Sequence, residues 1–321
     1  MKAAAFYTRQ PRHWWLAVGW LTVVGLAALL APVTSSPPDF AQLSQPPFLN
    51  TRHWLGTNAQ GLDVGQALLQ GARTVVGVSV PATLLTFLLG AVLGSLAGFL
   101  QNTRWRASPE LLLSILLPVA LSVTIGPRWL GAQLLLLPGL AVLLWLGGRR
   151  AFRGWRGVPV PVDTLVMGMI SLLDSLPLLV LVLIAAAVQR PSLSGLLILL
   201  SLTCWTTPAR LMRAATLQVK ALPYAEAAEA AGLPAAQIIR RHIWPNTWQV
   251  LLTRFPLTVA MLIGFETTLS FLGVGLPPEV PSWGRLLAGI RQSPTDWWLL
   301  AWPGLALVLT ILSLQLLTQR K

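Results

Sequence analysis

Few side chains in this chain of 321 residues could perform catalysis or hold a metal ion. Its three histidines, His13, His53 and His242, are scattered without metal-ligand spacing, and a single cysteine, Cys204, excludes a cysteine cluster. The sequence contains no Gly-x-x-x-x-Gly-Lys-Ser/Thr phosphate loop, so we expect no ATP site of that type. No Ser-His-Asp arrangement can be argued either. We therefore expect a protein that is not an enzyme and has no catalytic residue, metal or cofactor.

Two acidic residues lie inside long apolar stretches of the sequence. Asp174 falls within residues 165–189, and Glu266 falls within residues 250–275. Charge in hydrocarbon is costly and often functional, so both are candidates to line a translocation path or to pair across a subunit interface. The alternative is structural: Asp174 would cap or hydrogen-bond a neighbouring helix, and Glu266 would pair with an arginine of a partner.

Residues 224–246 form a polar segment between apolar stretches. An alanine-rich helical segment carrying Glu226 breaks at Gly232 and restarts at Pro234, which suits a first helical turn. The second helix is expected to stop at Pro245-Asn246. Small side chains would let another protein approach the first helix closely; they are Ala225, Ala227, Ala228 and Ala231. From physics alone, a pair of amphipathic helices lying on the membrane surface remains an alternative.

The composition indicates a membrane protein whose helices must position these groups. Apolar residues make up 55% of the chain, charged residues make up 10%, and the mean hydropathy is +0.67. A helix needs about 20 apolar residues to cross the hydrocarbon core. Eight stretches reach or approach that length: 14–33, 74–100, 111–126, 129–147, 165–189, 193–212, 250–275 and 297–317. We therefore expect an all-α polytopic membrane protein, with residues 1–33 as a cytoplasmic N-terminus and an uncleaved first span.

The placement of the basic residues predicts the orientation of the chain. If the N-terminus is cytoplasmic, only six of the 23 lysines and arginines lie outside: Arg52, Arg73, Arg128, Arg190, Arg285 and Arg291. This asymmetry follows the positive-inside rule, and it places both termini and residues 224–246 in the cytoplasm. The net charge of +13 therefore reflects membrane topology. Without a soluble basic domain, nucleic acid is not an expected partner.

The polar segment resembles a loop of a known transporter family. Glu226-Ala227-Ala228, Gly232 and the run from His242 to Asn246 resemble the EAA loop of ATP-binding-cassette (ABC) importer permeases, with Trp244 where leucine is usual. In that family the loop docks on a cytoplasmic ATPase subunit. The resemblance implies that the coupling residues are Glu226, Ala227, Ala228, Gly232, His242 and Pro245.

Two further segments resemble the dipeptide, oligopeptide and nickel branch of this family. Residues 53–73, HWLGTNAQGLDVGQALLQGAR, resemble its LGTD-x-x-G-R-D element, with Asn58 and Leu62 replacing a charged pair. A turn-rich loop with Asp63 as an Asx cap also accounts for this local pattern. Residues 266–291 resemble a segment that ends a span and runs along the outer surface. Trp283 and Trp297-Trp298 there suit a membrane-interface belt.

The resemblance implies a transmembrane subunit of an ABC importer of the second-permease type, in a bacterial or archaeal plasma membrane. Its expected partners are a second permease subunit, two cytoplasmic ATPase subunits and an extracytoplasmic binding protein. The cargo could be a dipeptide, an oligopeptide or a nickel chelate. The competing hypothesis is an ion-coupled secondary transporter that uses Asp174 and Glu266, but we find no internal duplication, and such a protein needs no EAA loop.

The connection at residues 101–163 departs from the family pattern. Two additional apolar segments, 111–126 and 129–147, have basic residues on both outer flanks. We expect an inserted hairpin that adds two spans to a six-span core made of the first span, 74–100 and 165–317, giving about eight. A re-entrant or surface-lying hairpin is the alternative. Residues 34–73 are then an outer loop.

Overall fold

The computed structural model describes residues 12–32, 37–49, 51–102, 106–108, 113–114, 117–118, 138–144, 146, 157–188 and 191–319. The chain divides into two compact units, Met1–Ser95 with Ile170–Lys321 and Leu96–Met169. Most of the expected hairpin, 111–126 and 129–147, lies outside the described residues. Its crossing of the membrane therefore stays a prediction.

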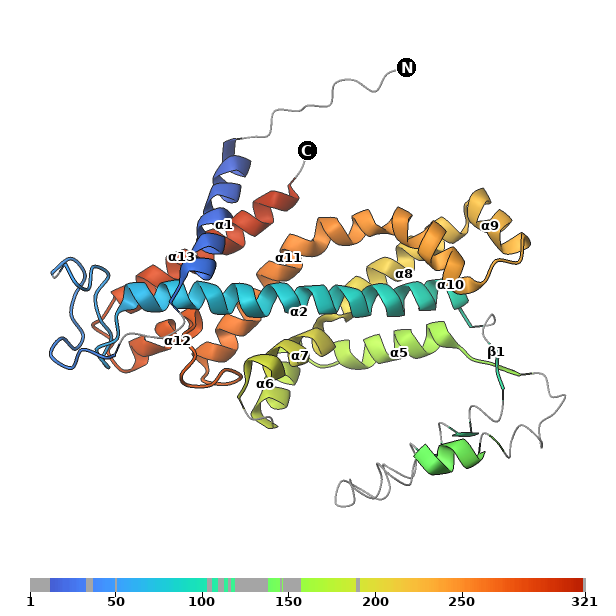
Figure 1. Ribbon diagram of the computed structural model, residues 1–321, viewed down its shortest axis with the longest axis horizontal. Coiled ribbons are helices and arrows are strands. Elements are labelled where there is room, and N and C mark those ends of the chain that lie inside the picture. The colour runs from blue at the N-terminus through green and yellow to red at the C-terminus, as the bar shows by residue number, and fades with distance from the viewer. Residues whose placement is uncertain are drawn as a thin grey trace. The chain divides into compact units, whose positions relative to one another are not determined.

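The described chain is helical almost throughout, which confirms the all-α polytopic class (Figure 1). Its α-helices are α1 Arg12–Leu30, α2 Val64–Leu100, α5 Val162–Asp174, α6 Leu178–Val188, α7 Leu193–Cys204, α8 Thr206–Lys220, α9 Pro223–Ala230, α10 Ala235–Ile238, α11 Trp244–Phe271, α12 Trp283–Ala288 and α13 Trp298–Thr318. A π-helical turn, Ile239–Ile243, joins α10 to α11, and a 3-10 turn, Gly289–Arg291, follows α12.

Among the described residues, four helical segments are long and apolar enough to cross a membrane: α1, α2, Ala235–Phe271 and α13. Two bent pairs could each complete a further span, α5 with α6 at 84° and α7 with α8 at 42°. The first break precedes Pro177, which disfavours helical geometry in the residue before it. The second break places Pro208 in the first turn of α8, where a missing N–H does no harm. This count of four to six accommodates the expected six-span core.

The smaller unit brings the two ends of the 101–163 connection side by side. Strand β1, Arg106–Ala107, pairs antiparallel with β2, Val158–Pro159. Beyond the strands, the Asp163 amide donates to the Gln101 carbonyl over 3.3 Å. Sequence periodicity did not predict these short strands. The two ends of the connection therefore meet within this unit.

Helix α2 begins ten residues earlier than the predicted span at 74. Asp63 caps it: its Oδ1 accepts a hydrogen bond from the Gln66 amide over 2.7 Å, which confirms the expected Asx cap. The other carboxylate oxygen lies 2.7 Å from Nδ1 of His53. The outer loop therefore ends at residue 63, where its last side chain fixes the start of a 37-residue helix.

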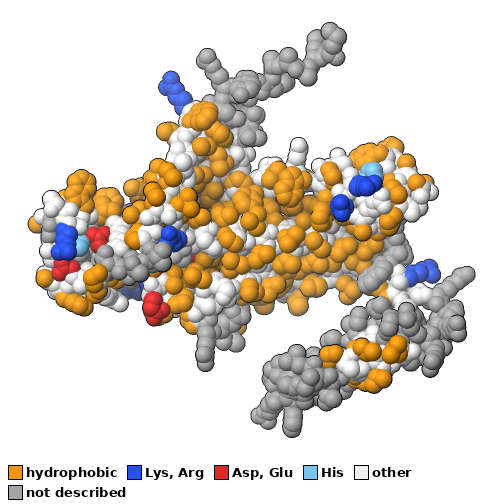
Figure 2. All heavy atoms as spheres, viewed as in Figure 1, with side chains coloured by type: hydrophobic (Ala, Val, Ile, Leu, Met, Phe, Trp, Pro, Cys, Tyr) orange, Lys and Arg blue, Asp and Glu red, His pale blue; other side chains and the backbone are white. Residues whose placement is uncertain are grey.

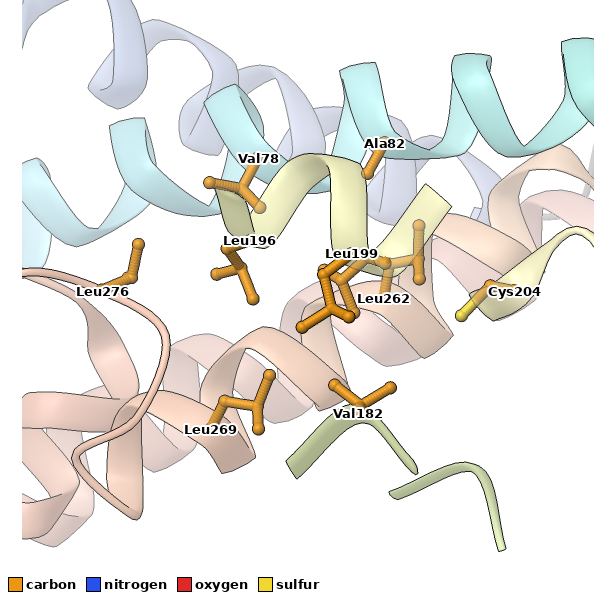
Figure 3. Close-up of a cluster of buried hydrophobic side chains, with 10 residues drawn as sticks. Val78, Ala82, Val182, Leu196, Leu199, Cys204, Leu262, Leu269 and Leu276 are labelled. Carbon is orange, nitrogen blue, oxygen red and sulfur yellow. The ribbon is translucent and has the colours of Figure 1, made fainter. Parts of the chain in front are cut away.

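The core of the larger unit is formed by aliphatic side chains from several spans (Figure 3). Val78 and Ala82 of α2 lie near Leu196 and Leu199 of α7 and Leu262 of α11. Two buried hydroxyls in these helices, those of Thr83 and Ser201, donate to carbonyls one turn earlier, as Ser201 does to the Leu197 oxygen over 2.7 Å. Such bonds satisfy polar groups without water, as a membrane interior demands.

Helices α2 and α8 approach each other closely at two glycines of α2. Gly90 and Gly94 form a Gly-x-x-x-Gly pattern, a spacing that lets two membrane helices approach closely. A Cβ atom added at Gly94 would lie 3.0 Å from the carbonyl carbon of Ala209, and one at Gly90 would lie 2.9 Å from the Ala209 nitrogen. The start of α8 is therefore packed directly against the backbone of α2.

We predict that Gly94→Ala lowers the thermal unfolding midpoint of the detergent-solubilised protein, because overpacking costs about 1–3 kcal/mol. Gly77→Ala on the same helix is the matched control, since its added Cβ meets nothing within 4 Å. The control should leave the midpoint unchanged or raise it, because alanine favours helix over glycine by about 1 kcal/mol. Equal shifts for both variants would contradict the close contact.

Candidate coupling loop and charged groups in the spans

The loop between α8 and α11 is a helix, a tight turn and a second helix. Helix α9 ends at Ala230, and Gly232 follows with φ of +74°. The Leu233 amide donates to the Ala228 carbonyl over 3.3 Å and the Gly232 amide to the Glu229 carbonyl over 2.9 Å. These two bonds form a Schellman motif, in which the left-handed residue is usually glycine. The predicted break at Gly232 is therefore confirmed, and its cause is backbone conformation, because an added Cβ would have open space.

The two faces of α9 differ in their exposure. Ala225 and Ala228 are buried against the rest of the loop, whereas Glu226 and Ala227 are exposed. The prediction that all four alanines offer a close approach to a partner is thus corrected: Ala225 and Ala228 pack internally. The free face combines small side chains with one carboxylate near the helix N-terminus, where negative charge is favoured.

The second helix does not stop at Pro245-Asn246 as predicted. A π turn carries the chain into α11: the Trp244 amide donates to the Ile239 carbonyl, five residues earlier. Pro245 then occupies the first turn of α11, where its missing N–H is tolerated. The Asn246 side chain donates to the His242 carbonyl over 2.6 Å. The helix from Ala235 to Phe271 is therefore continuous, and the second half of the loop is the first part of this span.

Buried isoleucines and one tryptophan anchor the loop to the rest of the larger unit. Ile238, Ile239 and Ile243 are buried, and Trp244 donates through Nε1 to the Ser95 hydroxyl of α2 over 3.2 Å. The His242 ring lies 6.2 Å from that of Tyr224 in α9, so it links the two halves of the loop. Sequence reasoning noted Trp244 as a departure from the family pattern but gave no hint of Ser95.

The surface of the larger unit is apolar over the middle of the helices and charged at their ends (Figure 2). Figure 2 shows hydrophobic side chains over the middle of the helices, basic side chains at the end that carries α9 and α10, and both acidic and basic side chains at the other end. Arg240 and Arg241 are exposed there. The end with α12 and the start of α2 lies opposite (Figure 1).

Asp174 forms an ion pair with Arg210. The carboxylate ends α5 and the guanidinium lies in the first turns of α8, so the pair joins two bent spans near their breaks. The side chains are 36% and 48% exposed, respectively. A partly exposed charge pair on a membrane helix face is expected to lie against protein or water, because lipid would not solvate it. The sequence gave Asp174 as a candidate but not its partner, since the two lie 36 positions apart; opposite charges in consecutive apolar stretches were the available signal.

Glu266 is fully buried within the chain itself. It accepts hydrogen bonds from the Ser270 hydroxyl over 2.9 Å and the Thr267 hydroxyl over 3.4 Å. Glu266 therefore lies inside the chain, and its expected place in a path or at a subunit contact stays a prediction. The structure therefore brings Glu266 together with neither Asp174 nor the coupling loop.

At the end of the larger unit that carries α12, the chain turns through Gly273 and Gly275, both with positive φ, as the sequence predicted. The expected belt of tryptophans needs correction. Trp283 is 2% exposed and donates to the Leu68 carbonyl over 2.9 Å, and Trp298 donates to the Thr57 carbonyl over 3.0 Å. Only Trp297 of the three is exposed. Trp283 and Trp298 therefore hold the outer segments onto α2 and its preceding loop.

We predict that Asp174→Asn and Arg210→Gln each lower the amount of protein recovered from membranes and its thermal midpoint, because each leaves one charge unpaired. The double variant Asp174→Asn/Arg210→Gln should recover part of the loss, with a coupling of about 0.5–3 kcal/mol. Strictly additive effects of the two changes would show that the pair contributes nothing as a pair.

Comparison with known proteins agrees with this arrangement. Residues 151–320 match the family described as "Binding-protein-dependent transport system inner membrane component". A peptide transport system permease of Brucella suis biovar 1 is 28% identical over 302 residues, covering 92% of this chain and 81% of the relative. The dipeptide transport system permease DppC of Bacillus subtilis is 27% identical, covering 92% and 74%, respectively. The oligopeptide transport system permease OppC of Haemophilus influenzae is 25% identical, covering 90% and 74%.

The family match covers more than half of the chain, including every bent span, the α8–α11 loop and the outer turn. This chain belongs to the binding-protein-dependent transport system inner membrane components, the permease subunits of ABC importers.

Proposed function

We propose that this chain is one of two permease subunits of a bacterial peptide importer, and that residues 224–246 couple it to a cytoplasmic ATPase. The observation that carries the proposal is the exposed face of α9. This helix lies between α8 and α11, and the Schellman turn at Gly232 ends it. Peptides are favoured over nickel chelates as cargo, because the relatives named above are peptide, dipeptide and oligopeptide permeases.

The proposed orientation places α9, α10 and both termini in the cytoplasm. Exposed Arg240 and Arg241 beside this loop satisfy the positive-inside rule. The opposite end, with the outer loop and α12, then faces the extracytoplasmic binding protein. The membrane is the plasma membrane, where an importer of this class meets both the binding protein and ATP.

The packing suggests how ATPase movement would reach the spans. A displacement of α9 acts on α8 through the short connection after Lys220, and on α11 through the continuous helix from Ala235. Helix α2 follows, because Gly90 and Gly94 lie against α8 and Ser95 binds Trp244. The breaks near Pro177 and Trp205 provide places where the spans can bend. Alternating access would arise from such rocking against the second permease.

Reconstitution tests the assignment directly. The chain alone in liposomes should show neither nucleotide hydrolysis nor peptide uptake. Adding the second permease and the two ATPase subunits should create vanadate-sensitive ATPase activity, further stimulated by the peptide-loaded binding protein. Proton-driven uptake by the purified chain alone, lost in Asp174→Asn or Glu266→Gln, would instead identify a secondary transporter.

Substitutions at the loop separate coupling from assembly. We predict that Gly232→Val reduces transport more than ATPase activity, because a side chain in the left-handed region costs about 1–2 kcal/mol and displaces α10 relative to α9. Gly232→Asn is the matched control and should stay near the wild-type level, since asparagine tolerates this conformation.

Glu226→Lys should weaken recovery of the ATPase subunits in co-purification, because it inverts the charge of the exposed α9 face. Glu226→Gln should have a smaller effect. Unchanged transport and unchanged ATPase recovery in both Gly232→Val and Glu226→Lys would rule out this loop as the coupling element.

A further inference from the structure

A cavity of about 630 Å³ opens at the outer end of the larger unit. One wall comes from residues 58–70, at the end of the outer loop and the start of α2, and the other comes from residues 278–299, around α12. This volume is within the range of small-ligand pockets, roughly 300–1,000 Å³. The function proposed above assigns no ligand to it.

Five side-chain amides form the largest group of polar side chains in the lining: Asn58, Gln60, Gln66, Gln70 and Gln292. Ser282, Arg285 and two carboxylates, Asp63 and Glu279, complete the polar lining, and Asp63 lies against His53 at 2.7 Å. An amide side chain donates and accepts hydrogen bonds, as a peptide unit does, so this lining suits a peptide backbone. None of the described lining residues is aromatic, so the cavity offers no stacking surface for a sugar ring or a nucleobase.

Arg285 supplies a fixed positive charge in the wall. Its guanidinium donates to the Pro277 carbonyl over 2.7 Å and to the Leu276 carbonyl over 3.1 Å, both neutral acceptors. A guanidinium has five N–H donors, so donors remain for a ligand. Burial lowers the pKa of Arg285, and Glu279 and Glu266 oppose this effect. A carboxylate that entered the cavity would compensate the desolvated charge with bidentate hydrogen bonds.

The wall around Arg285 is held in place before any ligand arrives. Ser282 caps α12 by accepting from the Arg285 amide over 3.2 Å, and Thr74 of α2 donates to the Pro281 carbonyl over 2.7 Å. At the surface, the exposed side chains of Gln60 and Gln292 hydrogen-bond to each other across the two walls. The charged group is thus fixed, while the contact that joins the walls is exposed and replaceable by a ligand amide.

We propose that this cavity binds the C-terminal end of a free cargo peptide, with Arg285 holding the carboxylate and the side-chain amides pairing with the peptide backbone. The proposal rests on the function proposed above, because it takes the cargo to be a peptide. It adds a receiving site on the permease itself, which the peptide would occupy between the binding protein and the translocation path.

Binding of trialanine and of trialanine amide to the assembled permease–ATPase complex, without binding protein, tests this site by calorimetry. The wild-type complex should bind the free acid at least about tenfold more tightly than the amide, since a hydrogen bond to a charged group contributes about 1.5–3 kcal/mol. Arg285→Gln should remove this preference by lowering the affinity for the free acid and leaving the affinity for the amide unchanged. Arg291→Gln is the matched control, because that guanidinium lies over the Phe271 ring, 4.0 Å from its centroid, and does not line the cavity.

A second variant keeps the test valid if Arg285→Gln fails to assemble. Gln292→Glu places a negative charge at the mouth of the cavity. It should lower the affinity for the free acid more than the affinity for the amide. The proposal is overturned if the wild-type complex binds neither peptide, if acid and amide bind equally, or if Arg291→Gln abolishes the preference as well. Stimulation of the wild-type ATPase by the loaded binding protein is measured in parallel; where it persists, only the receiving site is refuted and the importer function stands.

Discussion

The close contact of α2 with α8 is the constraint on which the rest of the larger unit depends. Glycines at 90 and 94 let the backbone of Ala209 approach α2 so closely that side chains are excluded. This contact fixes the start of α8, and α8 in turn carries both the Arg210 charge and the connection to α9. Without a hydrophobic driving force between helices in lipid, such packing has to be specific in shape. The two glycines of α2 therefore determine where α8 starts relative to α2.

Several buried polar groups of the bundle find partners within their own helices. Ser201 and Thr203 donate to carbonyls of α7, and Glu266 accepts from Ser270 and Thr267. The Asp174–Arg210 pair is the charged contact that the described spans leave partly open. Because a charge pair cannot face hydrocarbon cheaply, this face of α5 and α8 is a natural surface for water or for a second permease.

Hydropathy and turn residues predicted much of the fold, because the bilayer sets span length and glycine sets turns. They gave the positions of the spans, the break at Gly232, the Asp63 cap and the outer turn at Gly273 and Gly275. The sequence predictions were wrong at two residues whose types suit more than one environment. Pro245 read as a helix stop, yet a π turn absorbs it. Trp283 read as an interfacial residue, yet its indole is buried on α2. The partners Ser95, Arg210 and Arg285 depend on tertiary packing, which no local spacing encodes.

The two ends of the larger unit are built differently. At the α9 end, buried isoleucines and a continuous helix from Ala235 join the loop to the spans. At the α12 end, hydrogen bonds from Trp283, Trp298 and Thr74 hold short segments around a polar cavity. Many weak polar contacts can exchange with a ligand at little cost, whereas a packed apolar junction cannot. The α12 end can therefore exchange its contacts more readily than the α9 end.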